Sequence, residues 1–298
     1  MSIYDSAGSQ IYSAYNKNGV GLQVAYGSDG SEVFSGEPTP KTSLKVMTYN
    51  VGGWYIGSGT NVPVDEDAQY YALQNEMIQR ANADILFLCE YWDTFSKTGR
   101  TALSMLSQYY PYIEARGGGG GYFGRAICSK YPITSYTAHN FSSGNQSYYY
   151  DTAKITVDGK KVSLVVTHLT PNPASDQHLQ IQELADYLKT LNSFIAAGDY
   201  NSGISPTNNT DNVGSTQYQY SIKTFTDNGF HTANCGDFGF LVTCNDGVDG
   251  SGTNWDIDNI ITSADIDILS ASVDTTKLTD SVSGKIDHMP LIAELTIN

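Results

Sequence analysis

From residue 44 onwards, short apolar runs alternate with longer amphipathic segments, and this alternation limits the chain to a mixed α/β fold. The runs at residues 84–90 and 194–199 have the length of buried strands. Residues 66–83 and 176–193 instead carry aliphatic side chains at helical spacing. Two packed sheets flanked by helices account for this order. We therefore expect a four-layer α/β sandwich.

Further elements complete this expected sandwich. A short helix is predicted at residues 221–228, and strands are predicted at residues 44–50, 125–129, 257–262 and 290–297. Residues 154–168 form two strand-like runs around the dipeptide Asp158-Gly159, which predicts a tight hairpin.

The first 36 residues follow a different pattern. Three units beginning at Tyr4, Tyr15 and Tyr26 repeat Tyr-x-x-x-Gly-x-x-aliphatic every 11 residues. Each unit indicates strand residues around a glycine turn, and such a unit needs a neighbour to cover its apolar face. The Pro-rich residues 37–43 predict a linker, so residues 44–298 would form the main domain.

The repeats resemble those of tail or baseplate proteins of phages from gut bacteria. This resemblance implies attachment, either to a virion component or to another copy of the chain. The alternative is a β-rich tether without a specific function.

The charge balance excludes a broad basic surface for nucleic acid. The chain carries 16 Lys and Arg against 31 Asp and Glu, a net charge of −15. A nucleic-acid ligand would therefore need a short contact region, helped by metal cations that offset nearby carboxylates.

The first residues and the apolar runs bear on whether the chain has a signal sequence or a membrane span. The first residues show no basic and then apolar leader, and no apolar run approaches the length of a membrane span. We expect no Sec-type signal and no transmembrane segment. A cytoplasmic or virion-associated protein fits this pattern, and release by lysis stays open.

Most of the predicted strands have a polar residue at or beside one end, and these residues carry the chemistry. They are Asn50, Glu90, His168, Asp199 with Asn201, Asp258, and Asp287 with His288. Side chains at strand ends converge on one rim of a sheet, where clefts form. Carboxylate and amide oxygens are the ligands of hard cations. Phosphodiester hydrolysis further needs a base or orienting group for water and donors for the phosphoryl oxygens.

These strand ends belong to a series of motifs that resembles the endonuclease/exonuclease/phosphatase superfamily, which includes deoxyribonuclease I, apurinic endonucleases, sphingomyelinases and inositol phosphatases. The resemblance spans residues 44–297. Its motifs are Met-Thr-Tyr-Asn50-Val-Gly, Leu-Cys-Glu90, Gly-Tyr-Phe-Gly-Arg125-Ala-Ile-Cys-Ser-Lys-Tyr-Pro-Ile, Val-Val-Thr-His168-Leu, Ala-Gly-Asp199-Tyr-Asn201-Ser, Asp256-Ile-Asp258-Asn-Ile-Ile and Ile-Asp287-His288-Met-Pro-Leu. A Tyr occupies the usually aliphatic third position of Gly-Asp-x-Asn, which leaves the two functional residues in place.

The resemblance implies a metal site and a substrate contact. Glu90 would be the primary ligand of Mg²⁺ or Mn²⁺, with Asn50 and Asp287 nearby, and Ca²⁺ is a further candidate as a structural ion. Arg125, within the third motif, would contact the substrate.

The resemblance also implies the catalytic roles. His288 would lie beside the scissile phosphate, oriented by Asp258. His168 would be a second phosphate-facing histidine, as a hydrogen-bond donor or a general acid. Asp199 would orient or deprotonate the attacking water, and Asn201 would donate to a phosphate oxygen. Whether His288 or Asp199 is the base stays open.

Three functions are compatible with these observations. The first is a metal-dependent phosphodiester hydrolase, foremost a DNA endonuclease in which water attacks phosphorus. The second is a sphingomyelinase or inositol-phosphate phosphatase of the same superfamily, for which residues 238–242 are the one candidate membrane-contacting loop. The third is a non-catalytic phage or surface binding protein, which predicts the loss of a catalytic residue.

Overall fold

The computed structural model describes most of the chain. The described residues are 3–4, 10–15, 21–26, 32–36, 42–52, 64–93, 100–116, 124–171, 173–202, 215–235, 238–245, 254–275 and 288–298. The chain divides into two compact units, Met1–Thr42 and Ser43–Asn298.

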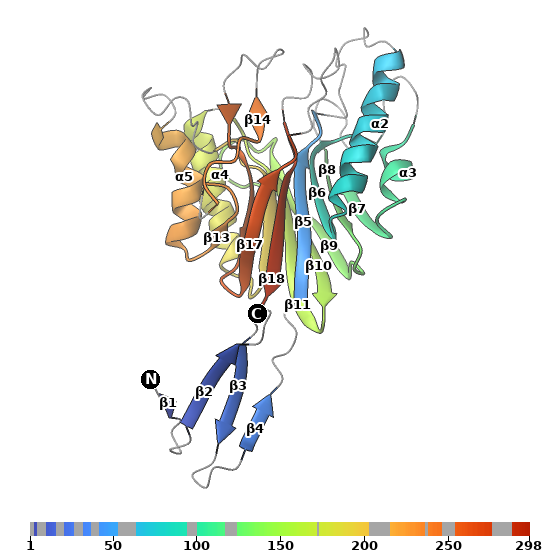
Figure 1. The fold of residues 1–298 in the computed structure, drawn as a ribbon. Helices are drawn as coiled ribbons and strands as arrows, with labels where there is room; N and C mark the ends of the chain where they lie inside the picture. Colours follow the sequence, from blue (N-terminus) through green and yellow to red (C-terminus); the bar gives the residue numbers. More distant parts are fainter. Residues whose placement is uncertain are drawn as a thin grey trace. The chain divides into compact units, whose positions relative to one another are not determined.

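The first unit is a four-stranded antiparallel sheet in the order β1-β2-β3-β4. Its strands are β1 (Ile3–Tyr4), β2 (Gln10–Tyr15), β3 (Gly21–Tyr26) and β4 (Glu32–Gly36). The β-rich character expected of the repeats is therefore confirmed (Figure 1). Their role in attachment stays a prediction.

The second unit contains two six-stranded mixed sheets and a small two-stranded one (Figure 1). Sheet I has the order β17 (Ile266–Val273), β18 (Leu291–Ile297), β5 (Thr42–Asn50), β6 (Ile85–Tyr91), β8 (Gly124–Ser129) and β7 (Tyr112–Arg116). Sheet II has the order β13 (His231–Thr232), β16 (Asp258–Thr262), β12 (Phe194–Asp199), β11 (Lys160–His168), β10 (Tyr149–Val157) and β9 (Ser135–Asn140). The small sheet pairs β14 (Cys244–Asn245) with β15 (Asn254–Trp255).

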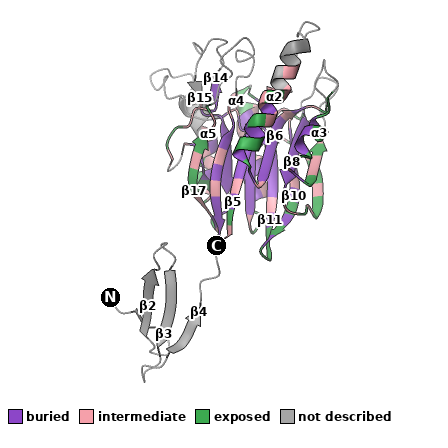
Figure 2. Ribbon diagram, turned by 45° about the vertical axis from the view of Figure 1, so that its right-hand side comes forward, coloured by how far each residue is buried: buried purple, intermediate pink, exposed green. Residues whose placement is uncertain are grey.

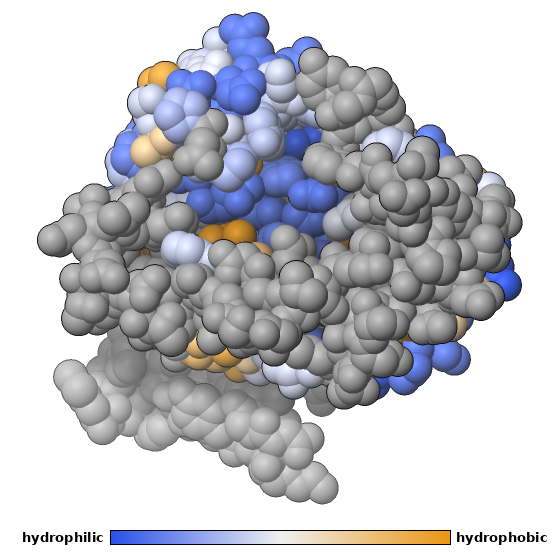
Figure 3. Space-filling model, turned by 90° about the horizontal axis from the view of Figure 1, so that it is seen from above, coloured by the Kyte–Doolittle hydropathy of each residue, from blue (hydrophilic) through white to orange (hydrophobic). Residues whose placement is uncertain are grey.

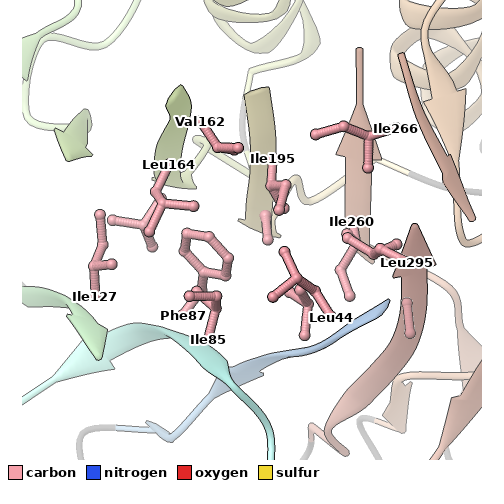
Figure 4. Close-up of a cluster of buried hydrophobic side chains, with 14 of the residues drawn as sticks. Leu44, Ile85, Phe87, Ile127, Val162, Leu164, Ile195, Ile260, Ile266 and Leu295 are labelled. Carbon is pink, nitrogen blue, oxygen red and sulfur yellow. The ribbon is translucent and has the colours of Figure 1, made fainter. Parts of the chain in front are cut away.

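The two large sheets pack face to face because their strands are apolar on both sides. In β6, Ile85 and Phe87 point into the core between the sheets, whereas Leu86 and Leu88 point the other way. Figure 4 shows Ile85 and Phe87 of sheet I close to Leu164 and Ile195 of sheet II. This two-sided burial explains why the sequence shows continuous apolar runs instead of strict alternation.

Helices cover the outer faces of both sheets (Figure 2). Side chains of α2 (Val64–Ala81) and α3 (Ala102–Leu106) share a second core with sheet I, and those of α4 (Ala174–Leu188) and α5 (Ser215–Asp227) share a third with sheet II. The predicted four-layer sandwich is therefore confirmed. No helix in the described ranges is long and apolar enough to cross a membrane.

Two helices differ in length from their predictions. The first, α4, ends at Leu188, five residues before the predicted end at Ser193. The apolar pattern continues past this end because Leu191 also packs against the third core, although it lies in a turn. The second, α5, starts at Ser215, six residues before the predicted start at Ser221.

The hairpin between β10 and β11 forms where Asp158-Gly159 predicts it. Val157 pairs with Lys160, so the loop has two residues. Both loop residues have positive φ, +47° at Asp158 and +83° at Gly159. This is the geometry that Asp-Gly favours in a two-residue hairpin.

Candidate active site

The strand ends of both large sheets form one polar site. Sheet I contributes Asn50 and Glu90 together with His288, which directly precedes the Met-Pro link into β18. Sheet II contributes His168, Asp199 with Asn201, and Asp258. Seen from above, hydrophilic residues gather in a hollow at the centre of this end of the molecule (Figure 3). Of the predicted site residues, Asp287 lies outside the described residues.

Asn50 lies at the centre of the site. Its amide nitrogen donates to Asp199 Oδ2 at 2.9 Å and to Glu90 Oε1 at 3.1 Å, and lies 3.4 Å from His288 Nε2. Its side-chain oxygen accepts from the backbone nitrogen of Gly52 at 3.0 Å. The residue is 1% exposed, so one buried amide holds two carboxylates from different sheets at fixed positions.

The side chain of Glu90 is directed into the site by an irregularity in β6. Against β8, Cys89 pairs with Arg125 and Tyr91 pairs with Gly124, so the register shifts at Glu90. Its φ is +54°, which is unusual for a residue with a Cβ. A bulge of this kind turns a side chain away from the direction that strand alternation would give it.

Asp199 is the last residue of β12, where the backbones of β12 and β11 lie very close together. The preceding residue, Gly198, has φ +151°, and a Cβ there would lie 1.9 Å from the Thr167 carbonyl oxygen. Asp199 Oδ1 accepts from the Asn201 backbone nitrogen at 2.8 Å. Asp199 Oδ2 lies 3.5 Å from His168 Nε2 and 3.6 Å from His288 Nε2. One oxygen of the Asp199 carboxylate therefore lies near the Nε2 atoms of both histidines.

His288 and Asp258 form a buried pair. His288 Nδ1 lies 2.7 Å from Asp258 Oδ2, and the two side chains are 7% and 1% exposed. The neighbouring Asp256, the alternative in the same motif, instead accepts from Cys235 Sγ at 2.7 Å. The structure thus pairs His288 with the residue that the motif indicates.

Arg125, which lies in β8 of sheet I, forms a hydrogen bond with the backbone of His168 in sheet II. The Arg125 Nη2 donates to the His168 carbonyl oxygen at 3.2 Å, and the guanidinium lies 3.6 Å from the ring centre of Tyr149. Arg116 lies over the same ring at 3.8 Å. Arg125 is only 2% exposed, so its contact with substrate stays a prediction.

Asn201 follows β12 with a φ of +46°. Its side-chain nitrogen donates to the Leu169 carbonyl oxygen at 2.9 Å. An amide nitrogen carries two hydrogens, so a second donor remains on this group.

The two site histidines differ in charge. Burial, reinforced by the cations of Arg125 and His288, holds the pKa of His168 well below its ordinary value. Burial also disfavours the charged form of His288, yet the carboxylates of Asp258 and Asp199 raise its pKa well above its ordinary value. His168 is therefore neutral and His288 is an imidazolium at neutral pH.

Asp199 is poised between its two protonation states. Burial raises its pKa to about 7, and the neighbouring Asp258 adds to this effect. The His288 cation and the donors from Asn50 and Asn201 oppose it. A carboxylate in this range can accept a proton near neutral pH.

Two groups of side chains offer ligand atoms for a divalent cation. One ligand atom each from Asp199, Asp258 and His288 lie within 4.8 Å of one another. In this group, however, Asp258 and His288 already bind each other. The second group is the Glu90 carboxylate and the Asn50 side chain, which leave the Asp258–His288 pair intact. The Asn50 nitrogen faces Glu90 and its oxygen accepts from Gly52, so the amide would turn its oxygen toward a bound cation.

Other polar features of the sequence lie elsewhere. His139 stacks on Tyr150 at the edge strand β9, His178 stacks on Tyr220, and His231 is exposed. Cys235 and Cys244 are not joined by a disulfide. The Gly-rich residues 117–121 lie outside the described residues.

Sequence comparison identifies the family. The profile of the endonuclease/exonuclease/phosphatase family matches residues 47–280. The chain belongs to this family, whose members are hydrolases of phosphate esters. It has no significant match among curated protein sequences.

Solved structures show the same fold. Truncated Caenorhabditis elegans TDP2 is 16% identical with a TM-score of 0.61, over 85% of this chain and 97% of that chain. D. rerio TDP2, complexed with a single-strand DNA product, is 14% identical with a TM-score of 0.62, over 85% and 99%. A family protein from Bacteroides thetaiotaomicron is 15% identical with a TM-score of 0.63, over 87% and 96%.

Proposed function

We propose that this chain is a divalent-metal-dependent endonuclease that cleaves DNA by attack of water on phosphorus. The observation that carries the proposal is the buried network in which Asp199 meets Asn50, His168 and His288. Within this network Asp199 can accept a proton, the His288 imidazolium is a cationic hydrogen-bond donor, and neutral His168 is a second donor. These are the groups that phosphodiester hydrolysis requires.

Asp199 is the base in this proposal. Its pKa of about 7 lets the carboxylate take a proton from water near neutral pH, whereas the raised pKa of His288 keeps that ring protonated. As the water oxygen bonds to phosphorus, its proton passes to Asp199, the ester P–O bond breaks and the leaving oxygen is protonated from solvent.

The two histidines and Asn201 bind the phosphoryl oxygens. The His288 imidazolium, fixed by Asp258, offers Nε2–H to the charge that develops on these oxygens. Neutral His168 and the second hydrogen of the Asn201 amide are further donors. Buried Arg125 adds positive potential from behind His168, without needing direct contact.

Glu90 and Asn50 would hold the metal, with Asp287 as the third ligand that the sequence predicts. When bound, Mg²⁺ or Mn²⁺ supplies charge neutralisation at the phosphate and at the leaving oxygen. The fit rests on the donor set, since Glu90 is turned into the site and lies beside the Asn50 amide.

Two observations favour DNA over an inositol polyphosphate or a lipid as the substrate: the low content of basic residues, and the similarity to a structure solved with DNA. An inositol polyphosphate requires a pocket with several cations, and the low content of Lys and Arg, 16 against 31 Asp and Glu, disfavours such a substrate. A similar fold, D. rerio TDP2, is complexed with single-strand DNA. For a lipid substrate the supporting feature is Phe240, which is 52% exposed in the predicted contact loop.

The decisive experiment offers three substrates under the same Mg²⁺ conditions, namely supercoiled plasmid, sphingomyelin vesicles and inositol hexakisphosphate. We expect plasmid nicking to exceed turnover of the other two by at least a hundredfold. Faster sphingomyelin hydrolysis that Phe240→Ser abolishes would replace the proposal with the lipid-directed alternative. DNA binding without turnover of any substrate would favour the non-catalytic alternative.

A further inference from the structure

Thr243 connects the two members of the Asp258–His288 pair through separate groups. Its hydroxyl oxygen accepts from the Asp258 backbone nitrogen at 3.0 Å. Its carbonyl oxygen accepts from the backbone nitrogen of Met289, the residue after His288, at 2.6 Å. Thr243 is fully buried, and its contacts join positions that lie 15 residues or more apart along the chain.

The backbone around Thr243 strengthens this connection. The Thr243 nitrogen donates to the Trp255 carbonyl oxygen at 2.9 Å, which continues the pairing of β14 with β15. The next residue, Cys244, forms an antiparallel bridge with His288. Residues 243–245 therefore lie between the segment that leads to Asp258 and the segment that carries His288.

The side chain of Asn234 also links the backbone near Thr243 to the backbone of Asp258. Its amide nitrogen donates to the carbonyl oxygens of Asp258 at 3.1 Å and Leu241 at 2.8 Å. Its side-chain oxygen accepts from the Leu241 nitrogen at 2.8 Å. Asn234 is fully buried, so the backbone two residues before Thr243 is tied to the backbone of Asp258.

We propose that Thr243 is a positioning residue whose hydroxyl sets the Asp258 backbone so that its carboxylate meets His288 Nδ1. The inference rests on the proposed function, because it concerns how that site is aligned. A hydrogen bond of 2.7 Å tolerates little displacement of either partner. A buried N–H without its acceptor is unfavourable, so the Asp258 backbone would shift toward another acceptor and carry the carboxylate with it.

A double-mutant cycle on plasmid nicking tests this role. Thr243→Val keeps the side-chain volume and removes the acceptor, so we expect kcat to fall about tenfold while KM stays within about threefold. Thr243→Ser keeps the hydroxyl and should restore the wild-type rate. In an Asp258→Asn background, Thr243→Val should cause no further loss, because its effect passes through Asp258.

Two results would overturn the inference. One is wild-type activity in a folded Thr243→Val protein. The other is an equal loss in the wild-type and Asp258→Asn backgrounds, which would indicate general destabilisation. If thermal melts show Thr243→Val to be unfolded, Thr243→Ala takes its place in the same cycle.

A measurement without substrate separates this inference from the proposed function. In metal-free protein labelled with ¹⁵N-histidine, the ring nitrogen shifts of His288 report its hydrogen bond to Asp258, and His288→Asn identifies the signals. We expect Thr243→Val to move these shifts and Thr243→Ser to leave them in place. Moved shifts in a protein inactive on every substrate would sustain the inference while the proposed function fails. Unmoved shifts would reject it.

Discussion

His288 Nδ1 and Asp258 Oδ2 lie 2.7 Å apart, although the two residues are 30 positions apart in the sequence and precede or begin strands of different sheets. Both side chains are buried. The pair therefore ties the two sheets together at the rim where the other site residues meet. Its alignment depends on the packing of one sheet against the other, so the site and the core of the sandwich are built together.

The two site histidines should be essential for turnover. Each donates to a phosphoryl oxygen in the proposed mechanism, so His168→Ala and His288→Ala should each lower kcat by roughly 10²–10⁴-fold. His231→Ala is the matched control, because that side chain is exposed at the start of β13 and should leave kcat unchanged. Equal losses in all three variants would point to misfolding, which circular dichroism would detect.

The ionisation of Asp199 should be visible in stability. Because its folded pKa is about 7, above the ordinary value of 3.8, the folded state binds this proton more tightly. Its stabilising contribution is present below about pH 4 and is lost as pH rises toward 7. Between about pH 4 and 5.5, His288 stays largely protonated in the folded and the unfolded state, because this window lies about one pH unit or more below the ordinary histidine pKa of 6.5.

Thermal melts in EDTA measure this effect. The stability of the wild type relative to Asp199→Asn should fall steadily as pH rises across that window. A difference that stays constant or grows with pH would show that the pKa of Asp199 is not raised.

Gly198 should be intolerant of any side chain. A Cβ there would lie 1.9 Å from the Thr167 carbonyl oxygen, so Gly198→Ala must separate β12 from β11 beside Asp199. We expect a loss of about 3 kcal/mol or more, or no folded protein. Gly159→Ala is the control, because its φ is also positive, at +83°, but no atom lies within 4 Å of the added Cβ. It should cost about 1 kcal/mol, and similar melting temperatures for both variants would contradict the argument.

Deletion of residues 1–36 should leave catalysis in place. The two units of the chain are separately compact, and every predicted site residue belongs to the second unit. We expect the nicking rate to stay within a few-fold of the full chain, while any self-association or particle association decreases. A clearly lower melting temperature together with lost activity would show instead that the repeats pack onto the sandwich as extra strands.

The sequence predicts the interior strands of the sandwich better than its edges. Interior strands such as β6 and β12 are buried on both faces, which leaves a continuous apolar run. The apolar pattern does not predict β7, β9 and β17, and each of these lies at the edge of its sheet. These strands are only partly buried and mix polar with apolar residues, so they lack the continuous apolar run that marks an interior strand.

For the site, the motif series predicts the residues that the structure brings together at the rim, because each follows or begins a recognisable strand. It does not predict Thr243 or Asn234, which act on backbone groups 15 and 24 residues away. Neither residue lies in a local pattern that indicates such a contact. The burial of Arg125 under Tyr149 is likewise a property of sheet packing, which a motif does not reveal.

The nicking of supercoiled plasmid by the full chain, with Mg²⁺ and with excess EDTA, tests the central claim most directly. We expect nicking with Mg²⁺, its loss in EDTA and its recovery when Mg²⁺ is restored. Glu90→Gln should fold normally and lose most of the activity, because it removes the carboxylate that would hold the cation. Glu76→Gln, on the exposed face of α2, should behave like the wild type. Nicking that continues unchanged in EDTA, or in a folded Glu90→Gln protein, would contradict the metal-dependent mechanism.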